Sequence, residues 1–323
     1  MSSEDYRPSL DDPNAWVPYR YHPSLAAAIA FTVVFGLVTL AQGALTSVRR
    51  VWYFTPFTIG GIFEIIGYIG RTISTNDLWA LGPYIVQSIL LLIAPAFFAA
   101  AIYIVLGRII RFVDGERHSL IRLKRLTKIF VTGDVAAFLL QMAGGGIQAG
   151  GTLSLMHLGE KIIIVGLFAQ VVFFGLFVVV ASLFHYRFTR HDASQLSRVR
   201  DSAWRRHIHA LYWGSGLIMF RSIFRVVEYL MGNNGFLLRH EYFLYIFDAV
   251  PMFLLMVLFL IIHPSQLTAL EAGSAGESAG NEARGRKWYF SKSRGPRYTR
   301  PALDASVMEL HKTGGSTAYS PST

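Results

Sequence analysis

Hydrophobic residues form seven long runs along the chain, and short polar segments separate them. The hydrocarbon core of a bilayer is about 30 Å thick, so a helix that crosses it needs roughly 20 mostly apolar residues. Each run reaches that length, and the pattern therefore predicts an all-α integral membrane protein built as a seven-transmembrane-helix bundle. The predicted spans are residues 24–46, 51–72, 80–106, 129–151, 161–184, 208–231 and 242–263.

The composition agrees with this class of protein. The chain has 323 residues, of which 53% are hydrophobic and 15% charged, whereas about 25% of residues are charged in an average soluble domain. This argues against a soluble enzyme. The net charge of +10 is explained by the basic cytoplasmic loops of membrane proteins, so no nucleic-acid partner is expected. The absence of cysteine excludes disulfides and thiolate metal sites.

Lys and Arg are distributed unequally between the two sides of the predicted bundle. With these spans, 23 of them fall on one side and 5 on the other. Because basic residues gather in cytoplasmic loops, the N-terminus is expected outside and the C-terminus in the cytosol. The chain then divides into an extracellular tail over 1–23, a transmembrane domain over 24–263 and a disordered cytosolic tail over 264–323.

One segment of the predicted cytosolic tail combines basic and aromatic residues. Arg284–Arg300 contains seven basic residues. Such a segment can bind the anionic lipids of the inner leaflet, at about 1 kcal/mol per basic residue. A solvated tail with a role in trafficking is the alternative.

Ionisable residues inside the predicted spans indicate the candidate functional site, because a charge at mid-membrane costs about 2.5–3.5 kcal/mol. Arg221, Arg225 and Glu228 follow an i, i+4, i+7 spacing and share one helix face. The second span repeats this spacing, the fourth has polar residues seven apart, and Asp248 precedes Pro251, which favours a kink. Facing inward together, these four polar faces would form one central pocket. The predicted substrate-binding residues are Glu64, Tyr68, Arg71, Asp134, Gln141, Arg221, Arg225, Glu228 and Asp248.

Two interpretations of these charges remain open. They could form a salt-bridge network that only fixes helix packing. Against this, four acids stand beside three arginines, Arg71, Arg221 and Arg225, which leaves one carboxylate in excess. A spare buried acid should hold a proton or accept a cationic ligand, and either outcome suits transport.

Glycines cluster on two of the predicted spans. Small residues let helix backbones approach closely, so we expect these glycines to serve helix packing. A loosened fourth span that moves during transport is the alternative. The glycines are Gly60, Gly61, Gly67 and Gly70 on the second span and Gly144, Gly145, Gly146, Gly150 and Gly151 on the fourth.

Several motifs of other membrane proteins are absent. The sequence has no G-x-x-x-x-G-K-[ST] loop for ATP hydrolysis. It has no lysine in the core of the seventh span for a retinal Schiff base, and its histidines lie at span ends rather than at membrane depth. We therefore expect no enzymatic activity, no cofactor and no metal.

Segments spread over residues 20–266 carry a resemblance to a known family. They are FEIIGYIGR (63–71), APAFFAAAIY (94–103), GDVAAFLLQMAGGG (133–146), RSIFRVVEYLMG (221–232), then Glu241, Asp248 and the closing HPS (263–265). In these segments the chain resembles the fungal RTA-like, lipid-translocating exporter family, which includes sphingoid long-chain-base exporters and aminosterol-resistance proteins. The resemblance implies seven spans, an outside N-terminus and a role in moving or sensing amphiphilic lipids and drugs.

Two functions fit these expectations. In the first, the protein translocates amphiphiles such as sphingoid long-chain bases or aminosterols and confers resistance to them, with the buried carboxylates receiving the ammonium group. In the second, it is a seven-helix receptor or signalling regulator that senses lipids. The partners in both are membrane lipids or cationic amphiphiles. The resemblance favours the plasma membrane over an endomembrane.

Overall fold

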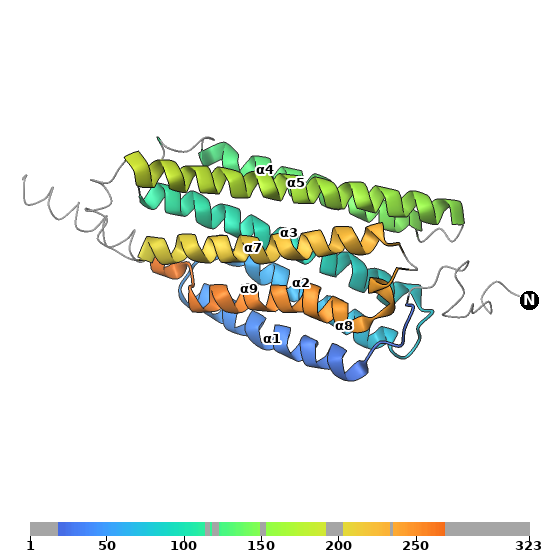
Figure 1. Ribbon diagram of the computed structural model, residues 1–323. Helices are drawn as coiled ribbons and strands as arrows, with labels where there is room; N and C mark the ends of the chain where they lie inside the picture. Colours follow the sequence, from blue (N-terminus) through green and yellow to red (C-terminus); the bar gives the residue numbers. More distant parts are fainter. Residues whose placement is uncertain are drawn as a thin grey trace, which may run out of the picture. The chain divides into compact units, whose positions relative to one another are not determined.

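Long helices lie side by side in the described part of the chain (Figure 1). The structure is a computed structural model that describes residues 19–113, 117, 123–148, 153–191, 203–232 and 235–268, all within one unit, Met1–Ala272. These residues form helices and connecting segments and no strand, which confirms the all-α prediction. The chain from residue 269 onward, including Arg284–Arg300, lies outside the described residues.

The first six long helices are each continuous. They are α1 (Leu25–Val48), α2 (Thr55–Ser74), α3 (Leu81–Phe112), α4 (Leu123–Gln148), α5 (Leu153–His191) and α7 (Ala203–Leu230). The last hydrophobic segment is composite, with α8 (Glu241–Leu244), the π-helical turn η4 (Tyr245–Ala249) and α9 (Val250–Ile261). Short 3₁₀ turns, η1 (Trp52–Phe54) and η3 (Leu237–Arg239), precede α2 and α8.

Several helices extend beyond the predicted spans. For example, α3 ends at Phe112 and α5 at His191, several residues after the predicted ends. Helical hydrogen bonding continues through the polar residues that follow the apolar run. A search for apolar residues does not include these polar residues in the predicted span. Hydropathy therefore locates the helices, whereas their ends depend on the backbone.

Five helical segments are long and apolar enough to cross a membrane. They are Leu25–Val48, Leu81–Phe112, Arg125–Gln148, Ser154–Arg190 and Glu241–Thr268. The helices α2 and α7 are not among them, because polar and charged residues lower their mean hydropathy, among them Glu64 and Arg71 on α2 and Arg221, Arg225 and Glu228 on α7. A multi-pass membrane protein is thus confirmed, while the count of seven spans and the orientation of the termini stay predictions.

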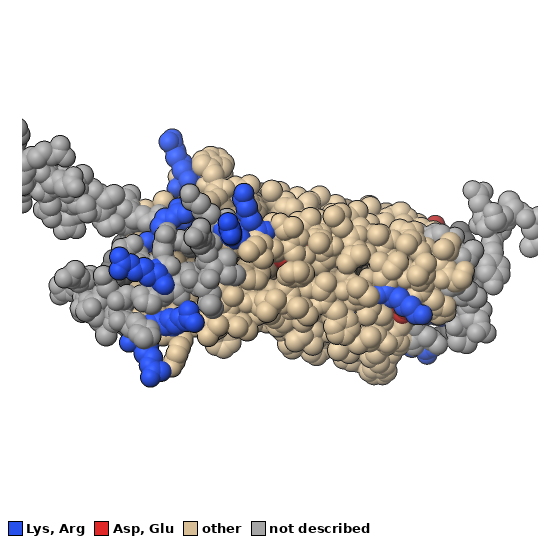
Figure 2. Space-filling model, turned by 90° about the horizontal axis from the view of Figure 1, so that it is seen from above, with Lys and Arg blue, Asp and Glu red and all other residues tan. Residues whose placement is uncertain are grey.

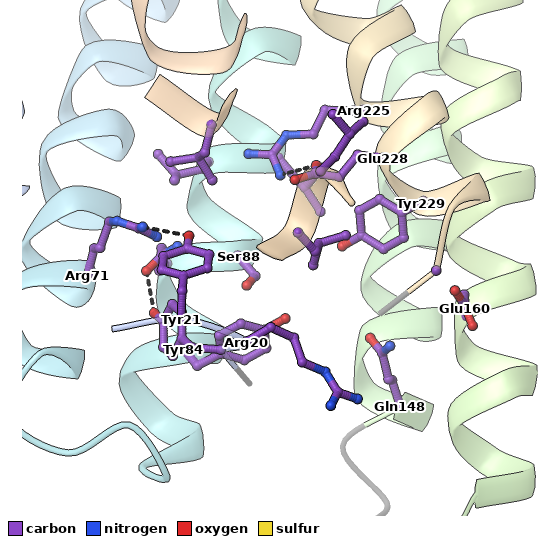
Figure 3. Close-up of a pocket in the computed structure, with 18 of the residues that line it drawn as sticks. Arg20, Tyr21, Arg71, Tyr84, Ser88, Gln148, Glu160, Arg225, Glu228 and Tyr229 are labelled. Atoms are coloured by element: carbon purple, nitrogen blue, oxygen red, sulfur yellow. Dashed lines mark hydrogen bonds and ion pairs between the residues drawn. The ribbon is translucent and has the colours of Figure 1, made fainter. Parts of the chain in front are cut away.

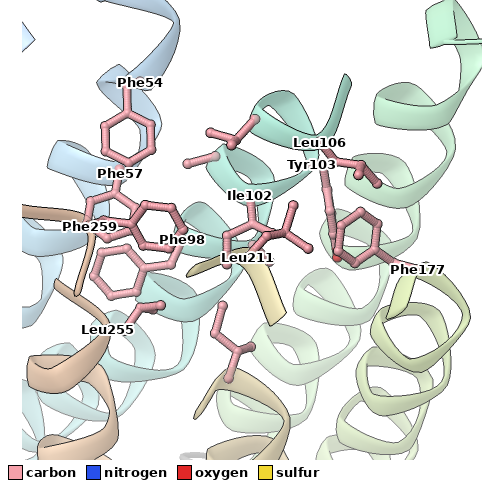
Figure 4. Packing of buried hydrophobic residues seen from close by; sticks show 14 of the residues in the cluster. Phe54, Phe57, Phe98, Ile102, Tyr103, Leu106, Phe177, Leu211, Leu255 and Phe259 are labelled. Atoms are coloured by element: carbon pink, nitrogen blue, oxygen red, sulfur yellow. The ribbon is translucent and has the colours of Figure 1, made fainter. Parts of the chain in front are cut away.

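The helix α3 packs against α2, α4 and α7, and α4 packs along α5. Buried aromatic rings pack between α2, α3, α5 and α9 (Figure 4). The ring of Phe57 on α2 lies 4.8 Å from that of Phe98 on α3 and 5.3 Å from that of Phe259 on α9. On the other side of α3, the rings of Tyr103 and Phe177 are 4.4 Å apart. Such pairs add about 0.5–1.5 kcal/mol each to the burial of their apolar area.

Glycines allow two of these helix pairs to approach closely. A Cβ added to Gly60 would lie 2.7 Å from the Phe98 ring, and one added to Gly144 would lie 2.7 Å from the carbonyl oxygen of Gly159. The packing prediction is confirmed at these positions, and also at Gly61, Gly67 and Gly70. It is wrong for Gly145 and Gly146, where an added Cβ would meet nothing within 4 Å. Gly150 and Gly151 lie outside the described residues.

Basic side chains gather toward one end of the helices (Figure 2). Exposed arginines and lysines follow α1, end α3 and α5, and begin α4 and α7. The opposite end has few of them. The described residues at the basic end include Arg49, Arg50, Arg111, Arg125, Lys128, Arg187, Arg190, Arg205 and Arg206.

Candidate functional site

Two arginines of α7 bind one aspartate in the interior. Arg225 donates hydrogen bonds to both carboxylate oxygens of Asp248, from Nε to Oδ1 at 2.9 Å and from Nη2 to Oδ2 at 2.7 Å. The Nε atom of Arg221 lies 2.6 Å from Oδ1, and these two side chains are only 2% and 1% exposed. Arg221 also donates to the backbone carbonyl of Leu91 on α3. Two buried cations thus share one anion.

Glu228 supplies the second anion. Its Oε2 accepts a hydrogen bond of 2.9 Å from Nη1 of Arg225, and its side chain is 7% exposed. The group of Arg221, Arg225, Glu228 and Asp248, called the ion network below, is therefore balanced, with two positive and two negative charges. The predicted stripe on α7 exists, and it meets the acid of the last span.

The backbone places Asp248 in an unusual turn. Residues Tyr245–Ala249 form the π-helical turn η4, and Pro251 stands at the start of the next α-helix. Proline has no N–H to bond the carbonyl four residues earlier, which frees a carbonyl at this turn. The sequence predicts a kink beside Asp248, and the structure places a π-helical turn there. Such π turns occur frequently at functional sites.

A cavity of about 80 Å³ lies beside Arg225 and Glu228 (Figure 3). We call it the vestibule, and the residues around it include Tyr21, Arg71, Glu160, Arg225, Glu228 and Tyr229. One water needs about 10–15 Å³ of such volume. The vestibule therefore has room for a few waters or a small headgroup such as an ammonium, and is too small for a lipid chain.

A smaller cavity of about 40 Å³ adjoins the vestibule, between α3 and α4. It shares Tyr84, Ser88 and Tyr229 with the vestibule and reaches Phe138 and Met142 on α4. We call it the side cavity. Met142 is 39% exposed, so this cavity leads toward the lipid-facing surface of the helices.

The second predicted stripe, on α2, extends away from the vestibule. Arg71 lines the vestibule, and Glu64 lies two helical turns deeper, about 10 Å along the axis. Glu64 is 1% exposed, and its Oε1 has no hydrogen-bond partner among the described residues. The charges of Arg221, Asp248 and Arg225 act on it, so it lies close to the ion network without an ion pair in the described part of the chain.

Tyr68 lies between these two α2 residues. Its hydroxyl is buried and has no hydrogen-bond partner among the described residues. Its ring stacks on Phe35 of α1 at 5.4 Å and on Tyr245 at 6.2 Å. The α2 stripe thus offers two polar groups, Glu64 and Tyr68, that a ligand could satisfy.

Arg71 pairs with an acid that the sequence pattern does not place in the site. Its Nη2 donates to Glu241 Oε1 at 2.8 Å and to the Tyr21 hydroxyl at 2.7 Å, and its Nε donates to the Tyr245 hydroxyl at 3.1 Å. Both carboxylate oxygens of Glu241 also accept from the backbone N–H of Ser24 at 2.9 Å. Glu241 therefore ties the segment 21–24 to α2.

Glu241 and Tyr21 were missed because they lie just outside the predicted spans. Glu241 precedes the last span, and Tyr21 falls in the predicted tail. A usable signal was present: Arg71 lies in the last turn of α2, so its partner had to lie near the same end of the bundle. Burial raises the pKa of Tyr21, which keeps its phenol neutral beside Arg71.

Asp134 and Gln141 do not join the ion network. The Tyr103 hydroxyl donates to Asp134 Oδ2 at 2.6 Å, and Asp134 lines a different cavity from the vestibule. Gln141 donates to Gln170 Oε1 on α5 at 2.9 Å. The expectation that four acids share one pocket is therefore wrong for Asp134, because α4 packs along α5 and α3 stands between α4 and α7. The roles of these residues in substrate binding stay predictions.

Comparison with known proteins bears on the segment that contains the ion network. Residues 57–271 match the family described as RTA1 like protein. The chain belongs to this RTA1-like family. Its matched region includes Glu64, the ion network and Glu241, whereas the RTA1-like match does not include Tyr21. The resemblance seen in the sequence is thus confirmed.

Several yeast relatives of this RTA1-like protein are similar over most of its length. Protein RTM1 of Saccharomyces cerevisiae is 35% identical, over 76% of this chain and 91% of the relative. Protoporphyrin uptake protein 1 of the same species is 37% identical over the same shares. Its Sphingoid long-chain base transporter RSB1 is 26% identical, over 75% of this chain and 72% of the relative. No solved structure matches the chain.

Proposed function

We propose that this protein translocates cationic amphiphiles, such as sphingoid long-chain bases or aminosterols, and so confers resistance to them. At the family level, relatives named as a sphingoid long-chain base transporter and a protoporphyrin uptake protein support membrane transport of lipid-like molecules. The observation that carries the proposal is Glu64, a buried carboxylate beside the ion network with no ion pair among the described residues. No catalytic step is part of this proposal.

The physical reasoning concerns the headgroup. An ammonium group at mid-membrane is costly unless a counter-charge meets it. Glu64, deeper in the bundle, offers a carboxylate without an ion pair among the described residues, whereas Asp248 is paired with Arg221 and Arg225, and Glu228 at the vestibule is paired with Arg225. The vestibule has room for a headgroup alone. The apolar chain would therefore remain in lipid while the headgroup moves through the vestibule.

We extend the proposal to the arrangement in the membrane. The helices α2 and α7 both pack against α3, and we propose that they cross the bilayer with the five apolar segments, giving seven spans. The basic end (Figure 2) is assigned to the cytosol because positive residues gather there in membrane proteins. The vestibule then opens toward the outside, at the plasma membrane, and the N-terminus is extracellular.

The energy source follows from what the sequence lacks. Without a nucleotide-binding loop, movement would follow the gradient of the amphiphile or of protons. We also propose that Arg284–Arg300 binds anionic lipids of the inner leaflet. Neither statement is needed for the carboxylate mechanism.

Reconstitution tests the proposed function. The purified full chain is placed in liposomes, and a fluorescent long-chain amine is followed as it moves between leaflets, with protein-free liposomes as the control. The proposal predicts that the amine changes leaflet faster with the protein than without it, and with no other protein present. Stoichiometric binding without flux would contradict translocation and support the sensing function instead.

A further inference from the structure

A third cavity, far larger than the vestibule, lies along α3 and α4. Its volume is about 470 Å³, within the range of about 300–1,000 Å³ typical of small-molecule sites. We call it the lateral groove. It is lined chiefly by apolar residues, including Ala96, Phe97, Ala100, Ile104, Val131 and Val135. Because Val135 is 48% exposed, the groove borders the lipid-facing surface of the helices.

One carboxylate lies in this apolar surrounding. Asp134 lines the lateral groove and is 3% exposed. Its Oδ2 accepts the hydrogen bond from Tyr103, but its Oδ1 has no partner in the described part of the chain. A buried acceptor without a partner costs about 1–3 kcal/mol, and more when it is charged. A ligand that donates to this oxygen would remove that cost.

The cation nearest in sequence does not neutralise Asp134. Lys128 is the one basic residue among those that line the groove, and it is exposed. It stands six residues earlier on α4, about 9 Å along the axis. No ion pair of Asp134 is present among the described residues. Charge complementarity therefore favours a ligand with an ammonium group over one with a hydroxyl group.

We propose that the lateral groove is a second binding site, in which Asp134 binds the ammonium group of a single-chain amine and the apolar lining holds its chain. The identity of this ligand rests on the proposed function. The site itself differs from the vestibule, because none of the residues of the ion network lines it. Between Thr127 and Phe138 the groove follows α4 for about 16 Å, roughly half the bilayer core.

The lateral groove adjoins the side cavity, which in turn adjoins the vestibule. Phe138 lines both the side cavity and the lateral groove, and the side cavity shares Tyr84, Ser88 and Tyr229 with the vestibule. The three cavities thus follow one another along the interface of α3 and α4. A headgroup that leaves Glu228 would reach Asp134 after it passes Phe138.

Photo-labelling tests this second site without any transport. The full chain in lipid nanodiscs is exposed to two photoreactive probes with the same alkyl chain, one a primary amine and the other an alcohol. Labelled residues are identified by mass spectrometry. We expect the amine to label the residues of the groove at least about tenfold more than the alcohol, a ratio equal to about 1.4 kcal/mol.

Three variants separate charge from shape. Asp134→Asn should abolish the preference for the amine, and Ala100→Phe should reduce labelling by both probes because the ring fills the groove. Ala136→Phe makes the same change at an exposed position of α4 outside the lining and should label as the wild type does. Melting temperatures in detergent verify that each variant is folded.

The outcomes also distinguish this site from the proposed function. Equal labelling by amine and alcohol in the wild type, or an unchanged preference in Asp134→Asn, would overturn the second site. If the preference is found but the liposomes show no flux, the site stands and translocation is refuted. If flux is found without labelling in the groove, translocation stands and the second site is refuted.

Discussion

The guanidinium of Arg225 binds the carboxylate of Asp248 through two hydrogen bonds, at 2.9 and 2.7 Å. This bidentate geometry matches the planar fork of arginine to both oxygens of the acid. Since Arg221 lies against the same carboxylate, Asp248 holds the last span to α7. Removal of its charge leaves two arginines with one acid, Glu228.

Asp248→Asn should therefore destabilise the fold strongly. Breaking a buried ion pair from one side costs about 3–5 kcal/mol, because an uncompensated charge remains. The measurement is the melting temperature of the purified protein in detergent. Asp77→Asn, a change at an exposed acid, should leave it nearly unchanged. A melting temperature for Asp248→Asn equal to that of the wild type would show that the network does not support the fold.

Glu241→Gln should release the segment 21–24. Glu241 accepts hydrogen bonds from Ser24 and Arg71, and hydrogen bonds to charged groups contribute about 1.5–3 kcal/mol. We expect amide hydrogen exchange in residues 19–27 to become at least about tenfold faster, while the middle of α3 stays unchanged. Equal exchange in wild type and variant would mean that Glu241 does not hold this segment.

Cysteine labelling tests the seven spans, and the chain has no cysteine of its own. Asp77→Cys and Arg49→Cys flank α2, whereas Arg206→Cys lies in the first turns of α7 and Arg239→Cys follows its end. A membrane-impermeant maleimide on intact cells should label positions 77 and 239, whereas positions 49 and 206 should react only after permeabilisation. Labelling of both members of either pair from outside would exclude a crossing by that helix.

Phe138→Ala should speed the movement of amphiphiles. The ring lines both the side cavity and the lateral groove, and its removal would join them. Flux of the fluorescent amine in liposomes should rise severalfold. Phe168→Ala, the same change at a ring that is 47% exposed on α5, serves as the control. If the flux in Phe138→Ala stays at or below the wild-type rate, a path along α3 and α4 is contradicted.

Much of the fold follows from the sequence because lipid imposes strong rules on it. Runs of about 20 apolar residues must be helical, since a bilayer offers no partner for free backbone groups. The spacing of Arg221, Arg225 and Glu228 places them on one face of α7, and the structure confirms that face. Pro251 likewise marks the turn that carries Asp248.

The parts that could not be predicted depend on how helices rotate against one another. Periodicity shows that Asp134 and Gln141 share a face of α4. The direction of that face depends on the close packing of the two helices, in which Gly144 of α4 lies against α5 and Gly166 of α5 lies against α4. The pairing of Arg71 with Glu241 needs a contact between residues 170 positions apart. With Glu241 included, two acids of the predicted set, Glu64 and Asp134, have no ion pair among the described residues.

The central claim is that a carboxylate in the polar interior carries the headgroup, and Glu64→Gln tests it most directly. This change removes the ionisable group, keeps the shape and breaks no ion pair of the described residues. The measurement is the rate at which a fluorescent long-chain amine crosses liposomes that contain equal amounts of folded wild type or variant. We predict a rate at least about tenfold lower for Glu64→Gln, or about 1.4 kcal/mol, with recovery in Glu64→Asp. Equal rates for wild type and Glu64→Gln, at equal melting temperatures, would contradict the account.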